Sequence, residues 1–333
     1  MSLMPIEPGM KLAVSISSEV DDDYLAFVKQ MGVDWVVLWT TDPDAGAAYY
    51  IKTKQRFANA GLQVYGFGNG NLHNQDAIVL GLENRAAKIE AYKRHLRSLG
   101  EAGIPYTTYA HMANGVWSSE REVTRGSASA RSFDVNRKHV GYRSSKRFYA
   151  PLSHGRVYSE AEIWDNFHHF VAEVAPVAEE QGVRIGIHPD DPPQLELGGV
   201  PRCIFSSFDG YQRAMDIAAS PNIGICFCIG CWLEGGPLMG KGTAESLRAF
   251  GRQNRVFKVH FRNVNQPLPH FVETFVDDGY YDMYKAIEAL MEIDFNGVLI
   301  PDHVPSMGDD PRLGVAYTIG WIKAMMRRAE PAT

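Results

Sequence analysis

Short apolar runs alternate with longer amphipathic segments along most of the chain. The apolar runs predict eight strands, at residues 11–15, 34–39, 62–67, 105–109, 184–188, 222–228, 256–261 and 298–301. Apolar positions spaced by three and four predict helices at residues 21–31, 49–60, 84–102, 160–181, 209–219, 244–252, 280–293 and 313–328. Eight strands that alternate with helices favour the α/β class and a closed (β/α)₈ TIM barrel over an open doubly wound sheet.

One segment interrupts this alternation. Residues 112–158 follow the fourth predicted strand, are rich in Ser, Arg and Gly, and show little periodicity. We predict a single barrel domain over residues 4–333, preceded by a cloning remnant, with this segment as a long excursion on the catalytic face. Loops of this length are usually lids or binding loops, and otherwise disordered. Its basic residues suit an anionic substrate, a solvated surface or a subunit contact: Arg121, Arg125, Arg131, Arg137 and Lys138.

The charge balance narrows the choice of partners. Lys and Arg number 33 against 39 Asp and Glu, a net charge of −6, so we expect neither nucleic acid nor an anionic membrane as a partner. No apolar run approaches the ~18 residues that a membrane helix needs. No signal-peptide pattern opens the sequence, so we expect a cytoplasmic protein.

Three of the four cysteines lie close together, in the run Cys226-Phe-Cys228-Ile-Gly-Cys231. In a reducing compartment, disulfides rarely persist. A zinc or iron–sulfur cluster would need a further thiolate or a second such run, and none follows. We therefore expect Cys226 and Cys231 to be small buried hydrophobes.

The last four predicted strands each end on a side chain that can bind a metal ion: His188, Cys228, His260 and Asp302. Because side chains alternate along a strand, all four can point inward at the C-terminal mouth, where barrel enzymes place their active sites. Each residue alone would more often be structural. Together at matching depth, two imidazoles, a thiolate and a carboxylate predict a divalent transition-metal site, and the soft thiolate by itself favours zinc.

Two neighbours of these residues are candidates for substrate chemistry. Arg262 shares the parity of His260, so we expect its guanidinium at the mouth, where it suits a carboxylate or a sugar oxygen. The alternative is an ion pair with Asp190 or Asp191 that only stiffens the rim. His303, next to a predicted ligand, is the best-placed general acid or base.

Five segments form a set: His188-Pro-Asp-Asp-Pro-Pro193, Cys226-Phe-Cys228-Ile-Gly230, Val259-His260-Phe-Arg262-Asn263-Val264, Asp282-Met283 and Pro301-Asp302-His303. This set resembles the D-mannonate dehydratase family, specifically across residues 184–303 and more loosely before, where residues 109–117 match best. The resemblance implies a xylose-isomerase-like barrel and a Mn²⁺ ion, with Fe²⁺, Co²⁺ or Zn²⁺ as alternatives. It also implies dehydration of D-mannonate to 2-keto-3-deoxy-D-gluconate, as in glucuronate catabolism.

The family pattern also implies roles for individual residues. The implied metal ligands are His188, Cys228, His260 and Asp302. His303 would take part in proton transfer. The implied substrate contacts are Arg262, Asn263, His111 and Trp117. The implied partners are a small sugar acid and further copies of the chain in a homo-oligomer.

The sequence departs from the family pattern at several positions. Ile300 stands where the family has an Arg, Val276 where it has a His, and no Tyr falls in the short loop after His303. Residues 231–234 occupy a place where small polar residues are usual. The second proton-transfer group therefore stays open among three candidates: Tyr280, Tyr281 and a metal-bound hydroxide.

Two other functions stay open for this sequence. A sugar isomerase or epimerase would reprotonate the same enediolate that a dehydratase forms. A barrel stabilised by a structural metal ion would have four protein ligands and no catalysis.

Overall fold

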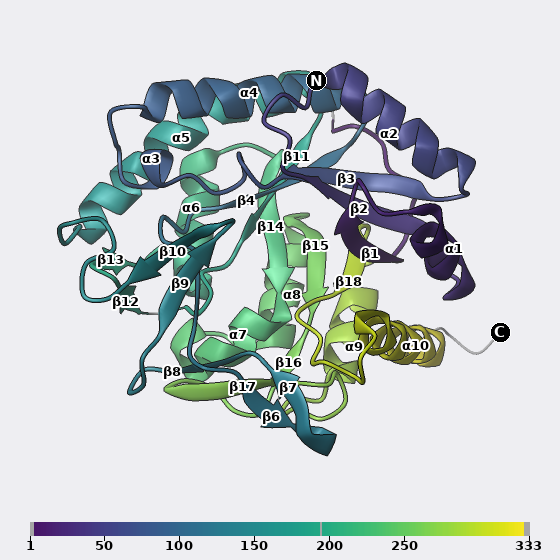
Figure 1. Cartoon of the computed structure of the whole chain (residues 1–333). Helices are drawn as coiled ribbons and strands as arrows, with labels where there is room; N and C mark the ends of the chain where they lie inside the picture. The colour runs from purple at the N-terminus through teal and green to yellow at the C-terminus, as the bar shows by residue number, and fades with distance from the viewer. Residues whose placement is uncertain (1–2, 194, 330–333) are drawn as a thin grey trace.

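A barrel of parallel strands forms the centre of the computed structural model, which describes residues 3–193 and 195–329 (Figure 1). The hydrogen-bonded order of its strands is β3-β2-β1-β18-β15-β14-β11-β4. Between β3 and β4, the rings of Tyr65 and Tyr106 lie 5.2 Å apart and close the circle. The barrel strands are β1 (Lys11–Ser17), β2 (Trp35–Thr40), β3 (Gln63–Asn69), β4 (Tyr106–Ala110), β11 (Arg184–His188), β14 (Ile223–Cys228), β15 (Val256–Phe261) and β18 (Val298–Pro301). The predicted (β/α)₈ barrel is confirmed.

Helices cover the outside of the barrel (Figure 1). In α5, Ser159 caps the first turn reciprocally with Glu162, and Gly182 ends the helix in the left-handed conformation at φ 66°. The long helices are α1 (Asp22–Gln30), α2 (Ala47–Asn59), α4 (Arg85–Glu101), α5 (Glu160–Gln181), α6 (Phe208–Ala218), α8 (Thr243–Arg252), α9 (Tyr284–Glu292) and α10 (Pro311–Ala329). The short ones are α3 (Asp76–Val79), α7 (Ile229–Gly235), and the 3₁₀ turns η1 (Arg125–Ser127) and η2 (Gly236–Met239).

Polar side chains are paired inside the barrel. The Tyr65 hydroxyl donates to the carbonyl oxygen of Phe257 at 2.5 Å. The Lys258 ammonium donates to the Thr108 hydroxyl at 3.0 Å, directly below His260 on the same strand. These bonds satisfy groups that would otherwise be costly to bury.

Residues 112–158 are ordered rather than irregular, contrary to what their composition indicates. They form short strands: β5 (Val116–Ser118), β6 (Glu122–Thr124), β7 (Ala128–Ala130), β8 (Ser132–Asp134), β9 (Val140–Arg143) and β10 (Lys146–Tyr149). β8 pairs with β17 (His270–Thr274), which in turn pairs with β16 (Asn263–Val264). A further small hairpin follows β11, from β12 (Glu196–Leu197) and β13 (Val200–Pro201). The excursion is therefore joined to the chain that follows β15.

Most basic residues of the excursion have partners within the protein. Arg125 pairs with Asp277 at 2.9 Å, and Arg137 pairs with Asp134 at 3.3 Å. Arg121 donates to the Ser129 hydroxyl at 2.8 Å. These contacts hold the excursion in place and leave fewer cations for an anionic substrate than the sequence indicates.

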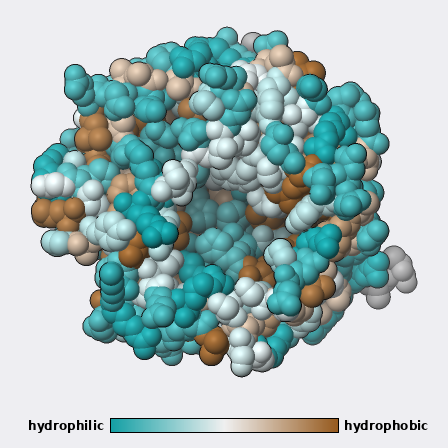
Figure 2. Space-filling model, in the orientation of Figure 1, coloured by the Kyte–Doolittle hydropathy of each residue, from teal (hydrophilic) through white to brown (hydrophobic). Residues whose placement is uncertain are grey.

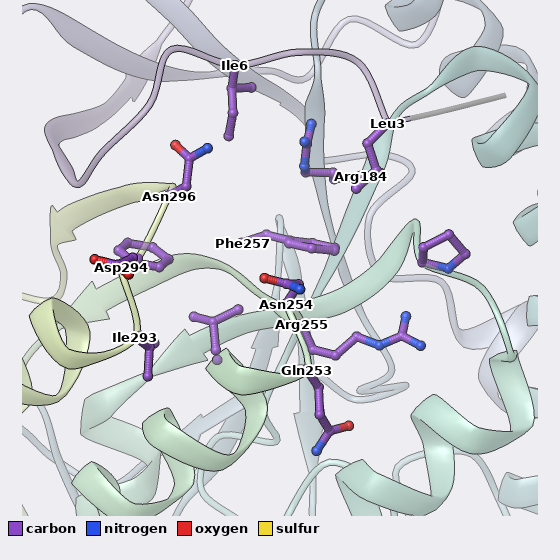
Figure 3. A pocket seen from close by; sticks show the side chains of 14 residues that line it. Leu3, Ile6, Arg184, Gln253, Asn254, Arg255, Phe257, Ile293, Asp294 and Asn296 are labelled. Atoms are coloured by element: carbon purple, nitrogen blue, oxygen red, sulfur yellow. The ribbon is translucent and has the colours of Figure 1, made fainter.

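A hydrophilic hollow opens near the centre of the face shown in Figure 2. A separate cavity of about 440 Å³ lies where the barrel strands begin, lined among others by Arg184 and Arg255 (Figure 3). Their two side chains extend in different directions (Figure 3). This cavity lies at the opposite end of the barrel from the ends of β11, β14 and β15.

No helix among residues 3–193 and 195–329 combines the length and the apolar character needed to cross a bilayer. The last residues of the predicted domain, 330–333, lie outside the described residues.

Candidate metal centre at the barrel mouth

The four side chains predicted as metal ligands meet at the C-terminal end of the barrel. His188 Nε2 lies 3.2 Å from His260 Nδ1. His260 Nδ1 lies 3.5 Å from a carboxylate oxygen of Asp302, and the other oxygen lies 3.8 Å from Cys228 Sγ. Strand alternation thus brings together residues that are up to 114 positions apart in the sequence, as the sequence predicts.

Each histidine uses one ring nitrogen for a contact away from the cluster. His188 Nδ1 lies 2.7 Å from the carbonyl oxygen of Pro189, and His260 Nε2 lies 3.3 Å from Cys226 Sγ. A protonated nitrogen at each contact leaves His188 Nε2 and His260 Nδ1 with their lone pairs facing each other. Burial lowers the pKa of His260 to about 4, so this imidazole is neutral near pH 7.

This donor set fits a divalent metal ion. Ligand atoms held about 2.0–2.3 Å from one ion are roughly 3–4 Å apart, which matches the separations within the cluster. Two histidine lone pairs that face each other are stabilised by a cation between them. Two imidazoles, a thiolate and a carboxylate suit a transition metal.

A buried network of ion pairs lies directly beside the cluster. Arg131 from the excursion contacts Asp191 at 2.5 Å and Glu273 at 2.9 Å. Arg262 contacts Asp191 at 3.2 Å, Glu234 at 3.0 Å, and Glu273. The five side chains are at most 9% exposed. This arrangement matches the alternative in which Arg262 pairs with Asp191, so its guanidinium is committed to protein carboxylates.

The two guanidinium groups help to determine which of the three carboxyl groups are ionised near pH 7. Burial raises the pKa of Glu273, but His303, Arg262 and Arg131 outweigh it and bring this pKa to about 2. The pKa of Asp191 is likewise lowered, because Arg131 and Arg262 outweigh its burial. Burial, followed by the Asp191 charge, raises the pKa of Glu234 to about 8. Near pH 7, two arginines therefore balance two carboxylates, and Glu234 is neutral.

His303 is attached to this network. Its Nδ1 lies 2.8 Å from Glu273 Oε1 and 2.6 Å from Arg262 Nη1. Because a guanidinium can only donate, the two contacts require different proton positions, and the acceptor Glu273 favours a proton on Nδ1. That leaves Nε2 for a substrate, on a side chain that is 38% exposed.

The environment also changes the charge of His303. Burial lowers the pKa of His303, but the charges of Asp302 and Glu273 outweigh it and raise the pKa to about 9. The backbone at this residue is left-handed, with φ 43°. That conformation is unfavourable for a residue with a side chain, and the surrounding contacts maintain it.

Two of the residues expected to bind substrate have contacts within the protein. The Asn263 amide nitrogen donates to the carbonyl oxygen of Tyr281 at 2.8 Å, and its side chain is buried. His111 Nδ1 lies 2.8 Å from the Tyr109 hydroxyl, and its ring packs edge-on against Phe167. The structure does not bring either side chain to the metal-ligand cluster.

Trp117 touches the network through its backbone. Its amide nitrogen donates to the carbonyl oxygen of Asp191 at 3.1 Å, and its carbonyl oxygen accepts from Arg131 at 2.7 Å. The indole is buried and packs against His139 within the excursion. Trp117 therefore joins the excursion to the site.

The two candidate tyrosines lie beside α7. The Tyr280 hydroxyl donates to the carbonyl oxygen of Leu233 at 2.8 Å. Tyr280 and Tyr281 line a shallow pocket with Trp232 and Lys241, and none of the predicted metal ligands lines that pocket.

Sequence reasoning missed the roles of Arg131, Glu234 and Glu273. The sequence gives little indication of these roles, because each residue is a single charged position within or next to a short helix or strand. Gly230 carries a clearer indication, because a Cβ at this position would collide with the Arg262 guanidinium. A glycine two residues after the predicted ligand Cys228 could have indicated a side chain packed against this backbone.

Comparisons with known proteins agree on one family. The family model for D-mannonate dehydratase (UxuA) matches residues 10–150 and 146–327. A mannonate dehydratase of Oceanobacillus iheyensis is 32% identical over 250 residues, which cover 68% of this chain and 69% of that protein.

Solved structures confirm the xylose-isomerase-like barrel. The crystal structure of mannonate dehydratase from Streptococcus suis serotype 2 superposes with a TM-score of 0.82 at 24% identity, over 96% of this chain and 95% of that one. D-psicose 3-epimerase from Clostridium cellulolyticum H10 gives a TM-score of 0.66 at 14% identity, over 97% and 100%. At these identities the likenesses show the fold alone.

Proposed function

The chain belongs to the D-mannonate dehydratase family, and from that premise we propose that it is a metal-dependent sugar-acid dehydratase, a carbon–oxygen lyase. Its first candidate substrate is D-mannonate and the product 2-keto-3-deoxy-D-gluconate, as in glucuronate catabolism. The observation that carries the proposal is the meeting of four donor side chains beside His303 at the barrel mouth.

The proposed metal ligands are His188, Cys228, His260 and Asp302. The proposed ion is Mn²⁺, with Fe²⁺, Co²⁺ or Zn²⁺ as alternatives. When bound, such an ion supplies a Lewis acid that stabilises the negative charge formed when the proton beside the carboxylate leaves.

The chain's own residues would handle the departing hydroxyl. Hydroxide is a poor leaving group, so proton donation from His303 Nε2 would accompany cleavage of the carbon–oxygen bond. Glu273 positions His303 by accepting from Nδ1. Arg262 and Arg131 position Glu273 in turn, because both contact its Oε1. Such general acid help contributes typically ~10²–10⁴-fold.

The proposal also includes the cellular location and the oligomeric state of the enzyme. We infer a cytoplasmic location, which the four free cysteines support. We also infer a homo-oligomer, because the excursion exposes apolar side chains such as Val123 and Tyr149.

The decisive experiment offers hexonates to the purified, Mn²⁺-loaded protein and measures 2-keto-3-deoxy acid. We expect product from D-mannonate, and a loss of about 10²-fold or more in kcat for His303→Asn with KM and metal content little changed. Proton exchange from D₂O into the substrate without this product would identify an isomerase or epimerase. A bound metal with neither exchange nor product would identify a structural ion and overturn the proposal.

A further inference from the structure

Two free cysteines sit side by side within the proposed metal centre. Cys228 ends β14 and Cys231 lies in α7, so the pair forms a Cys-x-x-Cys sequence. The donor atoms of His188, Cys228 and Cys231 all lie within 4.8 Å of one another. The other two cysteines are placed differently, since Cys226 contacts His260 and Cys203 is only half-buried.

One guanidinium group serves both sulfur atoms. Arg262 Nη2 donates to Cys228 Sγ at 3.4 Å and to Cys231 Sγ at 3.3 Å. This shared donor holds the two buried sulfur atoms next to each other at the C-terminal end of the barrel. Cys231 therefore lies where it can react with whatever forms on Cys228.

We propose that Cys228 and Cys231 are a thiol-modification site that forms a reversible disulfide when a peroxide reaches the metal-free centre. The proposal rests on the proposed function in one respect, because it takes Cys228 as a metal ligand. Metal binding and disulfide formation then exclude each other, since both use the same sulfur lone pairs.

The reaction proceeds in two balanced steps. The Cys228 sulfur attacks one peroxide oxygen, an S–O bond forms, the O–O bond breaks, and the leaving hydroxide takes the Cys228 thiol proton to become water. Cys231 then attacks the sulfur of this sulfenic acid, an S–S bond forms, the S–O bond breaks, and the hydroxide leaves as water with the thiol proton. Two sulfurs lose one electron each, and one peroxide molecule is reduced to two of water.

The experiment treats the metal-free full-length protein with hydrogen peroxide and then measures free thiols, intact mass and Mn²⁺ binding. We expect two thiols to disappear, the mass to fall by two hydrogen atoms, and Mn²⁺ binding to be lost. Dithiothreitol should restore all three. Protein loaded with Mn²⁺ before the peroxide should keep its thiols at least tenfold longer.

Variants identify the pair. Cys231→Ser and Cys231→Ala should instead gain oxygen atoms at Cys228 and fail to recover with dithiothreitol. Cys203→Ser, the matched control, should form the disulfide like the unaltered protein, and Cys226→Ser should do so too.

Two results would overturn the proposal. One is a loss of two thiols that persists in both Cys231 variants. The other is an unaltered protein that only gains oxygen atoms. These readouts do not use turnover, so a protein that forms the disulfide but does not dehydrate any hexonate would contradict only the proposed function.

Discussion

Arg131 offers the most direct test of the buried network of ion pairs, because this residue comes from the excursion and contacts the network's carboxyl groups. We consider Arg131→Met, which keeps an unbranched side chain and removes the charge. The guanidinium contacts Asp191, Glu273 and Glu234, at 2.5, 2.9 and 3.3 Å, and also donates to the carbonyl oxygen of Trp117. Its removal leaves two buried carboxylates with one arginine.

The magnitude follows from that imbalance. Removing one partner of a buried ion pair typically costs ~3–5 kcal/mol, because the other charge stays buried without compensation. For a chain of 333 residues, whose unfolding entropy is about 0.7 kcal/mol/K, that corresponds to a fall in Tm of roughly 4–7 °C. Arg131→Lys should lie between, because it keeps the charge and loses the planar fork that reaches two carboxylates at once.

Differential scanning calorimetry at pH 7 and low salt measures the effect. Arg137→Met is the matched control, because this excursion arginine pairs with Asp134 at 3.3 Å with its side chain 58% exposed. Exposed pairs contribute about 0–1 kcal/mol, so its Tm should change by at most about 1.5 °C. Equal, small shifts in both variants would refute the reasoning and show that the network contributes no more than a surface pair.

Two further predictions concern the same region. Equilibrium dialysis should show that Cys228→Ser abolishes tight Mn²⁺ binding and that Cys203→Ser leaves it unchanged. Cys226→Ala should weaken Mn²⁺ binding roughly 10–100-fold, because His260 Nε2 loses its partner. Tight binding by Cys228→Ser would exclude that sulfur as a ligand. Glu234 has a folded pKa of about 8, above its unfolded value near 4.5, so its contribution to stability is complete below about pH 4.5 and is lost as pH rises through about 8. The unfolding free energy of the unaltered protein should therefore fall with pH across this window relative to Glu234→Gln, and parallel pH profiles would contradict the raised pKa.

The barrel was predictable because its strands are buried on both faces. Three strands match their predicted bounds, at Arg184–His188, Val256–Phe261 and Val298–Pro301, and the other five differ by one or two residues at an end. Such strands read as continuous apolar runs, and polar or glycine-containing turns end them. The helix Glu160–Gln181 matches its predicted bounds as well, because Ser159 and Gly182 carry its cap signals.

The excursion was not predictable as strands. Its strands are three or four residues long, too short for a period-two pattern to stand out from the flanking turns. The partner of β8 is β17, more than 130 residues further along the chain. Local sequence carries no information about such a pairing.

The site, like the fold, has a part that the sequence predicts and a part that it does not. The four proposed ligands follow from strand parity at the barrel mouth, which any one strand reveals by itself. The role of Arg262 depends on its partners. Parity places it at the mouth, but Asp191, Glu234 and Glu273 approach from three other segments and take its hydrogen bonds.

Arg262 connects the parts of the site that perform different tasks. It donates to Cys228, lies 3.5 Å from Asp302, and contacts Glu273, the residue proposed to position His303. Replacing such a buried ionic network with apolar residues often increases stability, so stability alone does not explain its presence. We propose that its directional bonds instead fix Cys228 and His303, the proposed metal ligand and proton donor, relative to each other within the tolerance that catalysis requires. Since Arg131 completes this network from the excursion, the excursion forms part of the wall of the site in this structure.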